Sequence, residues 1–232
     1  MSAEPIRIGV VDSGSEPHQR ILASAAFVLQ DSQLWLSEAQ PDQLGHGGRI
    51  IDIIQQLAPE TELLSAQVFV DRFTTTAAQV AAAIDWLVEQ GAQVINLSLG
   101  LRQDRESLRD ACARALKQGV ILCAASPARG EPVYPSAYPG VFRMTGDARC
   151  DRAQISHLET EFADFGGCVR PLDDSMGQSG ASMGCAHLSA LVARGLQRDV
   201  RSLSEVRDWL ARQSVYHGPE QRRGVYTGAR DE

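Results

Sequence analysis

The chain has 232 residues, with 29 acidic side chains against 22 basic ones and a formal net charge of −7. This balance argues against a general phosphate-binding surface, so we expect no nucleic-acid partner. No segment approaches the roughly 18 uncharged apolar residues that span a bilayer, so we expect no membrane partner either. No Pro/Gly/Ser-rich or charged run divides the sequence, and we predict a single domain over residues 1–232.

The N-terminus passes straight into a strand pattern, without a basic region followed by an apolar stretch. We therefore expect no signal peptide or propeptide and a cytoplasmic location. The five cysteines have neither CxxC nor Cys/His ligand spacing; they are Cys112, Cys123, Cys150, Cys168 and Cys185. Free buried thiols are the interpretation that this scatter favours, and we expect no metal and no cofactor.

Strand and helix patterns alternate along most of the chain. Residues 6–11 are a short apolar run typical of a buried strand, with weaker strand candidates at 21–29 and 33–36. A helix follows residue 46 and runs to 57; further strands are predicted at 62–69, 92–100, 120–125 and 141–145, and further helices at 76–90, 105–118, 182–196 and 202–213. Strands separated by helices of this length indicate an α/β fold with a mostly parallel central sheet and helices on both faces.

Three polar residues lie at ends of predicted elements. Asp12 ends the first strand, where parallel sheets collect ligands and catalytic groups, although Asp-Ser-Gly is also an ordinary turn sequence. His46 precedes a helix between glycines that leave its ring accessible, although a lone histidine is often structural. Ser182 opens a helix among small residues, where free N–H groups and the helix dipole favour an oxyanion, although a serine there also suits an N-cap.

The order Asp, His, Ser is that of the subtilisin triad. GVVDSG resembles the aspartate motif of subtilases, the subtilisin-like serine proteases; GHGGRI resembles their histidine motif, SGASMGCAH their serine motif, VINLSLG their substrate-binding strand, and CAASP the stretch usually written AAGN. The resemblance covers most of the chain. It implies a three-layer subtilisin-like fold in which Ser182 is the nucleophile, His46 the general acid/base and Asp12 the group that orients and stabilises the imidazolium.

The same resemblance implies a peptide-binding edge. Ser98, Leu99 and Gly100 would pair with an extended substrate backbone, and the opposite side of the first pocket would be lined by Ala124, Ala125 and Ser126. Leu101 replaces a frequent glycine and is expected to narrow or redirect the cleft.

The oxyanion region departs from the family pattern. Pro127 stands in place of the usual asparagine and offers neither a side-chain amide nor a backbone N–H. The remaining donor is the N–H of Ser182, with Ser126 and Gln178 as candidate replacements. Catalysis is therefore expected to be slow.

Slow catalysis in a compact chain suits peptide maturation better than bulk digestion. The nearest resemblance is to leader-removing maturation proteases, of the kind that acts in quinohemoprotein amine dehydrogenase biogenesis. We therefore predict a serine endopeptidase whose partner is a polypeptide substrate with a leader segment, presented with its modifying enzymes. The alternatives are a pseudoprotease that binds a peptide without cutting it, which Pro127 favours and the complete triad disfavours, and an esterase with a small acyl pocket.

Overall fold

The computed structural model describes residues 4–173, 180–200 and 202–221. Within these residues ten strands form one sheet, in the order β10-β8-β9-β7-β6-β5-β1-β4-β2-β3. The strands are β1 (Arg7–Asp12), β2 (Ala23–Gln30), β3 (Gln33–Ser37), β4 (Glu62–Gln67), β5 (Val94–Leu97), β6 (Ile121–Ala125), β7 (Phe142–Gly146), β8 (Ile155–His157), β9 (Phe165–Gly167) and β10 (Tyr216–His217). The helices are α1 (His46–Leu57), α2 (Ala77–Glu89), α3 (Glu106–Lys117), α4 (Ala181–Leu196) and α5 (Leu203–Gln213).

The centre of the sheet is parallel. β1 pairs in parallel with β4 and β5, and parallel pairing continues through β6 and β7. Antiparallel pairs join β2 to β3 and β8 to β9. Because parallel strands end at a common edge, Asp12 at the end of β1, Ser98 after β5 and Ser126 after β6 reach the same edge of the sheet.

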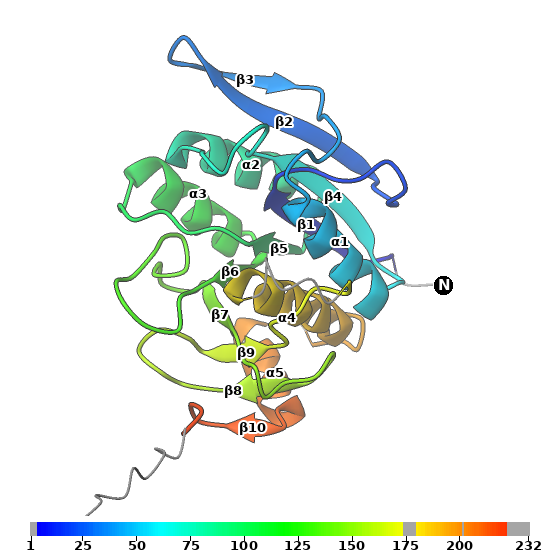
Figure 1. The fold of residues 1–232 in the computed structure, drawn as a ribbon, viewed down its shortest axis with the longest axis vertical. Coiled ribbons are helices and arrows are strands. Elements are labelled where there is room, and N and C mark those ends of the chain that lie inside the picture. Colours follow the sequence, from blue (N-terminus) through cyan, green and yellow to red (C-terminus); the bar gives the residue numbers. More distant parts are fainter. Residues whose placement is uncertain (1–3, 174–179, 201, 222–232) are drawn as a thin grey trace, which may run out of the picture.

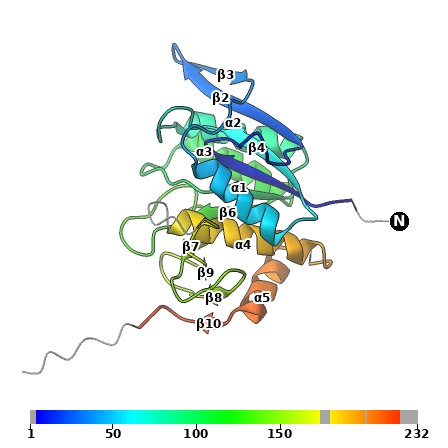
Figure 2. The ribbon, with the colours of Figure 1, turned by 45° about the vertical axis from the view of Figure 1, so that its right-hand side comes forward.

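Helices cover both faces of the sheet (Figures 1 and 2). α1 packs against α4 on one face, and α2 packs against α3 on the other. Each pair closes its own apolar core, with Ile50 and Leu188 fully buried in the first and Ile84 and Ala111 fully buried in the second. The predicted three-layer α/β fold with a mostly parallel sheet is confirmed.

Two local features differ from the sequence prediction. The short strands β8, β9 and β10 were not expected, because runs of two or three residues are too brief to show an alternating pattern. The first helix was expected to follow His46 but begins at that residue. Asp42 explains the earlier start, since one carboxylate oxygen accepts from the N–H of Gly48 at 2.8 Å and the other from the N–H of Gly45 at 2.9 Å. These bonds satisfy donors that a helix start leaves without partners.

Candidate active site

Three separate elements bring Asp12, His46 and Ser182 to one edge of the sheet. Asp12 ends β1, His46 begins α1, and Ser182 is the second residue of α4. Nδ1 of His46 lies 2.7 Å from Oδ1 of Asp12. His46 and Ser182 both line one cleft of about 670 Å³. The structure therefore places the histidine between a buried carboxylate and a cleft that also contains the serine.

The Asp12 carboxylate is held rigidly behind the ring. It is 1% exposed, and its Oδ1 also accepts from the backbone N–H of Ser13 at 2.8 Å and the Ser13 hydroxyl at 3.2 Å. The same hydroxyl accepts from the N–H of Gly47 at 2.8 Å, which connects the turn after β1 to the start of α1. Because a carboxylate only accepts, Nδ1 of His46 carries the proton and Nε2 is left as the basic nitrogen.

The surroundings of His46 tune its basicity. Burial of the ring lowers the pKa of His46, but the charge and hydrogen bond of Asp12 raise it, and the net result is a pKa above the ordinary 6.5. The charge of Asp42 adds to this rise, and the guanidinium of Arg49 opposes it. Asp12 therefore stabilises the protonated ring, which a general base becomes once it has accepted a proton.

The glycine after His46 has a packing cause. A Cβ atom at Gly47 would lie 2.4 Å from the carbonyl oxygen of Gly14 and 3.1 Å from the backbone nitrogen of Ser13. Gly45, on the other side, has a φ of +66°, which favours glycine. These two glycines thus allow the start of α1 to approach the turn that carries Asp12.

Ser182 exchanges hydrogen bonds with Ser98. The Ser182 hydroxyl donates to the carbonyl oxygen of Ser98 at 3.2 Å, and the Ser98 hydroxyl donates to the carbonyl oxygen of Ser182 at 3.2 Å. Gly184 lets the first turns of α4 pack closely against β7, since a Cβ there would lie 2.1 Å from the carbonyl oxygen of Thr145. Within the described parts of the chain, no hydrogen bond joins Ser182 to His46. These two bonds therefore hold the start of α4 against the residue that follows β5, and the Ser182 hydroxyl points at the Ser98 carbonyl oxygen.

A buried polar network supports this arrangement. The side-chain amide of Asn96 donates to the Ser98 hydroxyl at 2.9 Å, and its oxygen accepts from the Ser189 hydroxyl at 2.9 Å. Asn96 and Ser189 are fully buried. Neither residue was predicted to be part of the site, although an asparagine inside an apolar strand is itself a signal of a satisfied buried network.

Aromatic side chains form one wall of the cleft. The ring of Phe73 meets the ring of His46 edge to face, with centroids 5.7 Å apart, and meets Phe69 in a similar contact at 5.8 Å. Phe73 is 58% exposed. The complete lining comprises His46, Phe69, Phe73, Thr74, Thr75, Ser98, Leu99, Gly100, Leu101, Ala181 and Ser182. The phenylalanines were not predicted, because nothing in the sequence sets them apart from core residues.

The segment predicted to bind a substrate backbone also lines this cleft. Ser98, Leu99 and Gly100 line the cleft, and no hydrogen bond within the described residues uses the N–H of Gly100. Leu101 pairs with Tyr134 through two backbone hydrogen bonds of 2.7 and 2.8 Å. The segment is thus anchored at its far end by Leu101 and lines the cleft with an N–H at Gly100 that has no partner among the described residues.

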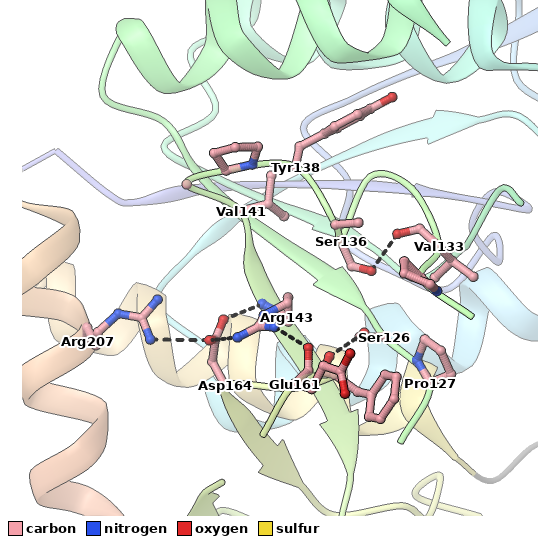
Figure 3. A pocket seen from close by; sticks show the side chains of 15 residues that line it. Ser126, Pro127, Val133, Ser136, Tyr138, Val141, Arg143, Glu161, Asp164 and Arg207 are labelled. Atoms are coloured by element: carbon pink, nitrogen blue, oxygen red, sulfur yellow. Dashed lines mark hydrogen bonds and ion pairs between the residues drawn. The ribbon is translucent and has the colours of Figure 1, made fainter. Parts of the chain in front are cut away.

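The other predicted substrate-binding residues lie elsewhere. Ala124 and Ala125 end β6 and are buried, and neither lines the cleft. Ser126 and Pro127 line a separate pocket of about 410 Å³, shown in Figure 3. Ser126 and Pro127 reach the same edge of the sheet as Ser98, but they line this second pocket and not the cleft that contains Ser182.

Few of the predicted groups can donate a hydrogen bond to an oxyanion beside Ser182. Ser126 donates its hydroxyl proton to the carbonyl oxygen of Phe162 at 2.6 Å, and Pro127 has no N–H. Gln178 lies outside the described residues. The backbone N–H of Ser182, in the first turn of α4, has no acceptor within the helix and lies at the positive end of the helix dipole. Among the candidates that the structure describes, this N–H is the donor best suited to an oxyanion.

Charged side chains among those that line the second pocket are linked to one another (Figure 3). Arg143 donates to the carbonyl oxygen of Glu161 at 2.5 Å and to Asp164 at 2.7 Å, and Arg207 lies 3.4 Å from the same Asp164 oxygen. Burial raises the pKa of Asp164, but its hydrogen bonds to Arg143 and the nearby guanidinium charges lower it by more. The net result is a pKa below the usual range of an aspartate. The ionised carboxylate thus joins β7 to α5, which is a structural role.

The described residues show no sign of other kinds of site. They contain no group of three or more His, Cys, Asp or Glu side chains placed to hold a metal ion. All five cysteines are buried free thiols, and burial raises the pKa of Cys123 to about 12, so that this thiol stays protonated. No helix in the same residues is long and apolar enough to cross a membrane.

Comparisons with known proteins agree with the geometry. The chain is 28% identical over 219 residues to the minor extracellular protease Epr of Bacillus subtilis, covering 86% of this chain and 33% of that protein. It is 27% identical over 206 residues to a thermostable alkaline protease of Halalkalibacterium halodurans, covering 81% of this chain and 55% of that protein. The chain thus spans only a third to about half of the length of these two relatives. It is 24% identical to subtilisin DY of Bacillus licheniformis, covering 89% of this chain and 82% of that protein.

The fold has a solved counterpart. A structure described as S41 psychrophilic protease matches with a TM-score of 0.64 and 20% identity, over 91% of this chain and 85% of the other. At this identity the match supports the fold alone. The family model described as "Subtilase family" matches residues 4–145, which include Asp12 and His46. The chain therefore belongs to the subtilase family of serine peptidases.

Proposed function

We propose that this chain is a serine endopeptidase in which Ser182 is the nucleophile, His46 the general base and acid, and Asp12 the stabilising carboxylate. The observation that carries the proposal is the 2.7 Å hydrogen bond from His46 to buried Asp12, beside a cleft that His46 shares with Ser182. Membership of the subtilase family supports it.

The chemistry needs one local movement. Ser182 Oγ turns away from the carbonyl oxygen of Ser98, a rotation between staggered side-chain conformers, and passes its proton to Nε2 of His46 as it attacks the scissile carbonyl carbon. The carbonyl oxygen becomes an oxyanion beside the N–H of Ser182. His46 then gives the proton to the departing amine, and water, deprotonated by the same nitrogen, hydrolyses the acyl-serine to release the second product.

The segment at Ser98 to Gly100 favours a peptide over a simple ester. An extended substrate can add to this segment as a strand, because the N–H of Gly100 faces no partner among the described residues. The aromatic side chains of Phe69 and Phe73, which line the same cleft, can then cover apolar substrate side chains. An endopeptidase is the activity that fits a cleft bounded in this way.

We further propose that the substrate is one dedicated polypeptide from which a leader segment is removed in the cytoplasm, while that substrate is bound to its modifying enzymes. The support is the missing donor at Pro127, because loss of the oxyanion asparagine in subtilisin costs about 10²–10³ in kcat. Binding energy from contacts far from the scissile bond compensates by fixing the carbonyl against Ser182. A dedicated substrate supplies such contacts, whereas a general digestive substrate does not.

The proposal is tested first with a fluorophosphonate probe, which labels an activated serine without any need to know the substrate. We expect labelling of the wild type, none of Ser182→Ala, and almost none of His46→Ala, which lacks the base. Ser204→Ala, which changes an exposed serine in α5, is the matched control and should label as the wild type does. Equal labelling of Ser182→Ala and wild type would exclude Ser182 as the nucleophile.

The dedicated substrate is tested separately by kinetics. Steady-state cleavage of a generic peptide is compared with cleavage of a candidate leader-bearing polypeptide, alone and with its modifying enzymes. We expect kcat/KM to be much higher for the second substrate. Comparable values for both would refute a dedicated substrate while leaving the peptidase intact.

A pseudoprotease remains the second candidate, because Pro127 removes a donor and the Ser182 hydroxyl is directed at Ser98. In that case the chain would bind a peptide in the cleft without cutting it. Binding of the leader without fluorophosphonate labelling and without cleavage is the result that favours this alternative.

A further inference from the structure

The outer edge of the sheet, strand β3, carries an exposed apolar surface. β3 is the last strand of the sheet order, and all five of its residues are exposed. Leu34 is 41% exposed, Trp35 52% and Leu36 62%. Figures 1 and 2 show the β2–β3 hairpin at the periphery, with no other element alongside β3. Its free backbone groups and apolar side chains are therefore both available to another strand.

This edge has none of the features that usually protect one. Proteins block exposed edge strands with charged residues, proline or a bulge. The sequence of β3, QLWLS, has no charged residue and no proline. Its pairing with β2 is unbroken from Ala26 opposite Ser37 to Gln30 opposite Gln33, so the strand has no bulge. An unprotected apolar edge of this kind is a template for strand pairing.

The hairpin is held in place from beneath. The side chain of Gln79 in α2 donates to the carbonyl oxygen of Phe27 in β2 at 2.8 Å, and the Phe27 ring meets Trp86 edge to face with centroids 6.1 Å apart. Beyond β3, the N–H of Gln40 donates to the side chain of Gln67 at 3.0 Å. A strand anchored at both ends loses little conformational entropy when it pairs.

We propose that β3 pairs antiparallel with β3 of a second copy of this chain, about a two-fold axis at Trp35. This register sets Trp35 opposite Trp35, Leu34 opposite Leu36, and Gln33 opposite Ser37. A residue can face its own copy across an antiparallel ladder either as a hydrogen-bonded or as a non-hydrogen-bonded pair. The two-fold register is therefore possible whether the N–H and C=O groups of Trp35 point away from β2 or toward it. A strand centred on an uncharged aromatic residue is thus complementary to itself.

The charges next to the strand tolerate this register. Two copies of a chain with net charge −7 repel each other, so opposed acidic residues at the interface would disfavour the dimer. In the two-fold pairing, no paired position from Gln33 to Ser37 carries a charge, and the nearest acids, Asp31 in the hairpin turn and Glu38 after the strand, lie outside the paired residues. The register therefore avoids the direct like-charge contacts that destabilise cross-strand pairs.

The pairing also accounts for the exposed leucines. Side chains on paired residues share a face of the sheet, so Leu34 and Leu36 of both copies would form one continuous apolar row, next to the half-exposed Leu29 of each β2. The two Trp35 rings would meet on the opposite face. No residue of β2 or β3 lines the catalytic cleft, so the dimer leaves that cleft open and does not depend on the proposed peptidase activity.

The oligomeric state tests the proposal. Sedimentation velocity of the purified chain should show a concentration-dependent species of twice the monomer mass. Trp35→Lys places two like charges opposite each other, and should abolish that species while leaving the far-ultraviolet circular dichroism spectrum of the folded chain unchanged. Val215→Lys is the matched control, because Val215 is equally exposed, at 54%, but distant in the sheet order. A wild type that stays monomeric, or a Trp35→Lys variant that still dimerises, overturns the proposal.

A cross-link tests the register. Directly opposite residues of antiparallel strands have Cβ atoms about 4.5–5.5 Å apart, within reach of a short bis-maleimide linker. All five native cysteines are buried, so a cysteine introduced at the surface is the reactive one. Trp35→Cys should therefore give a covalent dimer, and Val215→Cys should not. Dimerisation of the wild type without a Trp35→Cys cross-link would refute the two-fold register. Binding of a different protein to β3, in place of a second copy of this chain, would refute the proposed partner.

Discussion

Replacing Asp12 with asparagine separates the two roles proposed for this carboxylate, which are to orient the His46 ring and to stabilise its protonated form. Oδ1 of Asp12 receives hydrogen bonds from His46 Nδ1 and from both the N–H and the hydroxyl of Ser13. In Asp12→Asn the amide oxygen should keep this position, because an NH₂ group there would face the N–H of Ser13. The proton would then stay on Nδ1 of His46, and the main change would be the loss of a negative charge.

The size of the effect follows from that charge. Two unit charges about 4 Å apart interact with about 4 kcal/mol at an effective dielectric constant of 20, and each 1.36 kcal/mol corresponds to a tenfold rate change. Loss of the carboxylate should therefore slow acylation about 10³-fold. If the amide instead turned its NH₂ group toward His46, the tautomer would be wrong and the loss would approach the 10⁴-fold known for such triads.

The pH profile gives an independent readout. In the wild type, burial lowers the pKa of His46 but Asp12 raises it above 6.5, so the rate of fluorophosphonate labelling should fall on the acid side with a midpoint above 6.5. In Asp12→Asn the effect of burial on the pKa of His46 is offset only by the charge of Asp42, and the midpoint should move to lower pH. Asp71→Asn, an exposed carboxylate in the segment beside the aromatic wall, should leave both rate and midpoint unchanged. An unshifted midpoint in Asp12→Asn would refute this account of His46.

Three further changes test the supporting structure. Gly47→Ala puts a methyl group 2.4 Å from the carbonyl oxygen of Gly14, so overpacking should cost about 1–3 kcal/mol and lower the urea midpoint. Asn96→Leu removes the donor to Ser98 and should cost about 1–3 kcal/mol in the same titration, with slower fluorophosphonate labelling. Burial lowers the pKa of His187, so the unfolded chain binds this proton more readily than the folded chain does. The free energy of unfolding should therefore fall as the pH drops through 6.5. His187→Leu should lose less of this free energy than the wild type between about pH 7 and pH 5.

The sequence was sufficient to predict the fold class, because strand and helix patterns alternate along most of the chain. Asp12, His46 and Ser182 were identified together through motifs that resemble those of subtilases, whereas periodicity alone placed only Asp12 at the edge where the parallel strands end. The same resemblance assigned Ser126 to the substrate-binding pocket, but it could not show which pocket this residue lines. That choice depends on its hydrogen bond to the carbonyl oxygen of Phe162, 36 residues away.

Contacts between distant segments account for what the sequence left out. Phe73 belongs to the cleft only because a loop after β4 folds over His46, and Asn96 joins the site only through Ser189, 93 residues later. Nothing in the sequence sets Phe73 apart from core residues, and the asparagine inside β5 indicates a buried polar network without identifying its partners. The strands β8 to β10 were missed for a related reason, because pairing partners rather than their own length make them strands.

The position of Pro127 changes how oxyanion stabilisation can arise in the proposed mechanism. A side-chain amide must be aimed at the reacting carbonyl from a neighbouring loop, but here that loop faces the second pocket. Stabilisation then rests on the first turn of α4, whose position depends on the contact of Gly184 with Thr145 and on the exchange of hydrogen bonds between Ser98 and Ser182. A substrate strand along Ser98 would compete for the same carbonyl oxygen that holds the serine hydroxyl. Substrate binding would thereby release Ser182 toward His46, which makes activity depend on a well-seated peptide rather than on a fully formed oxyanion hole.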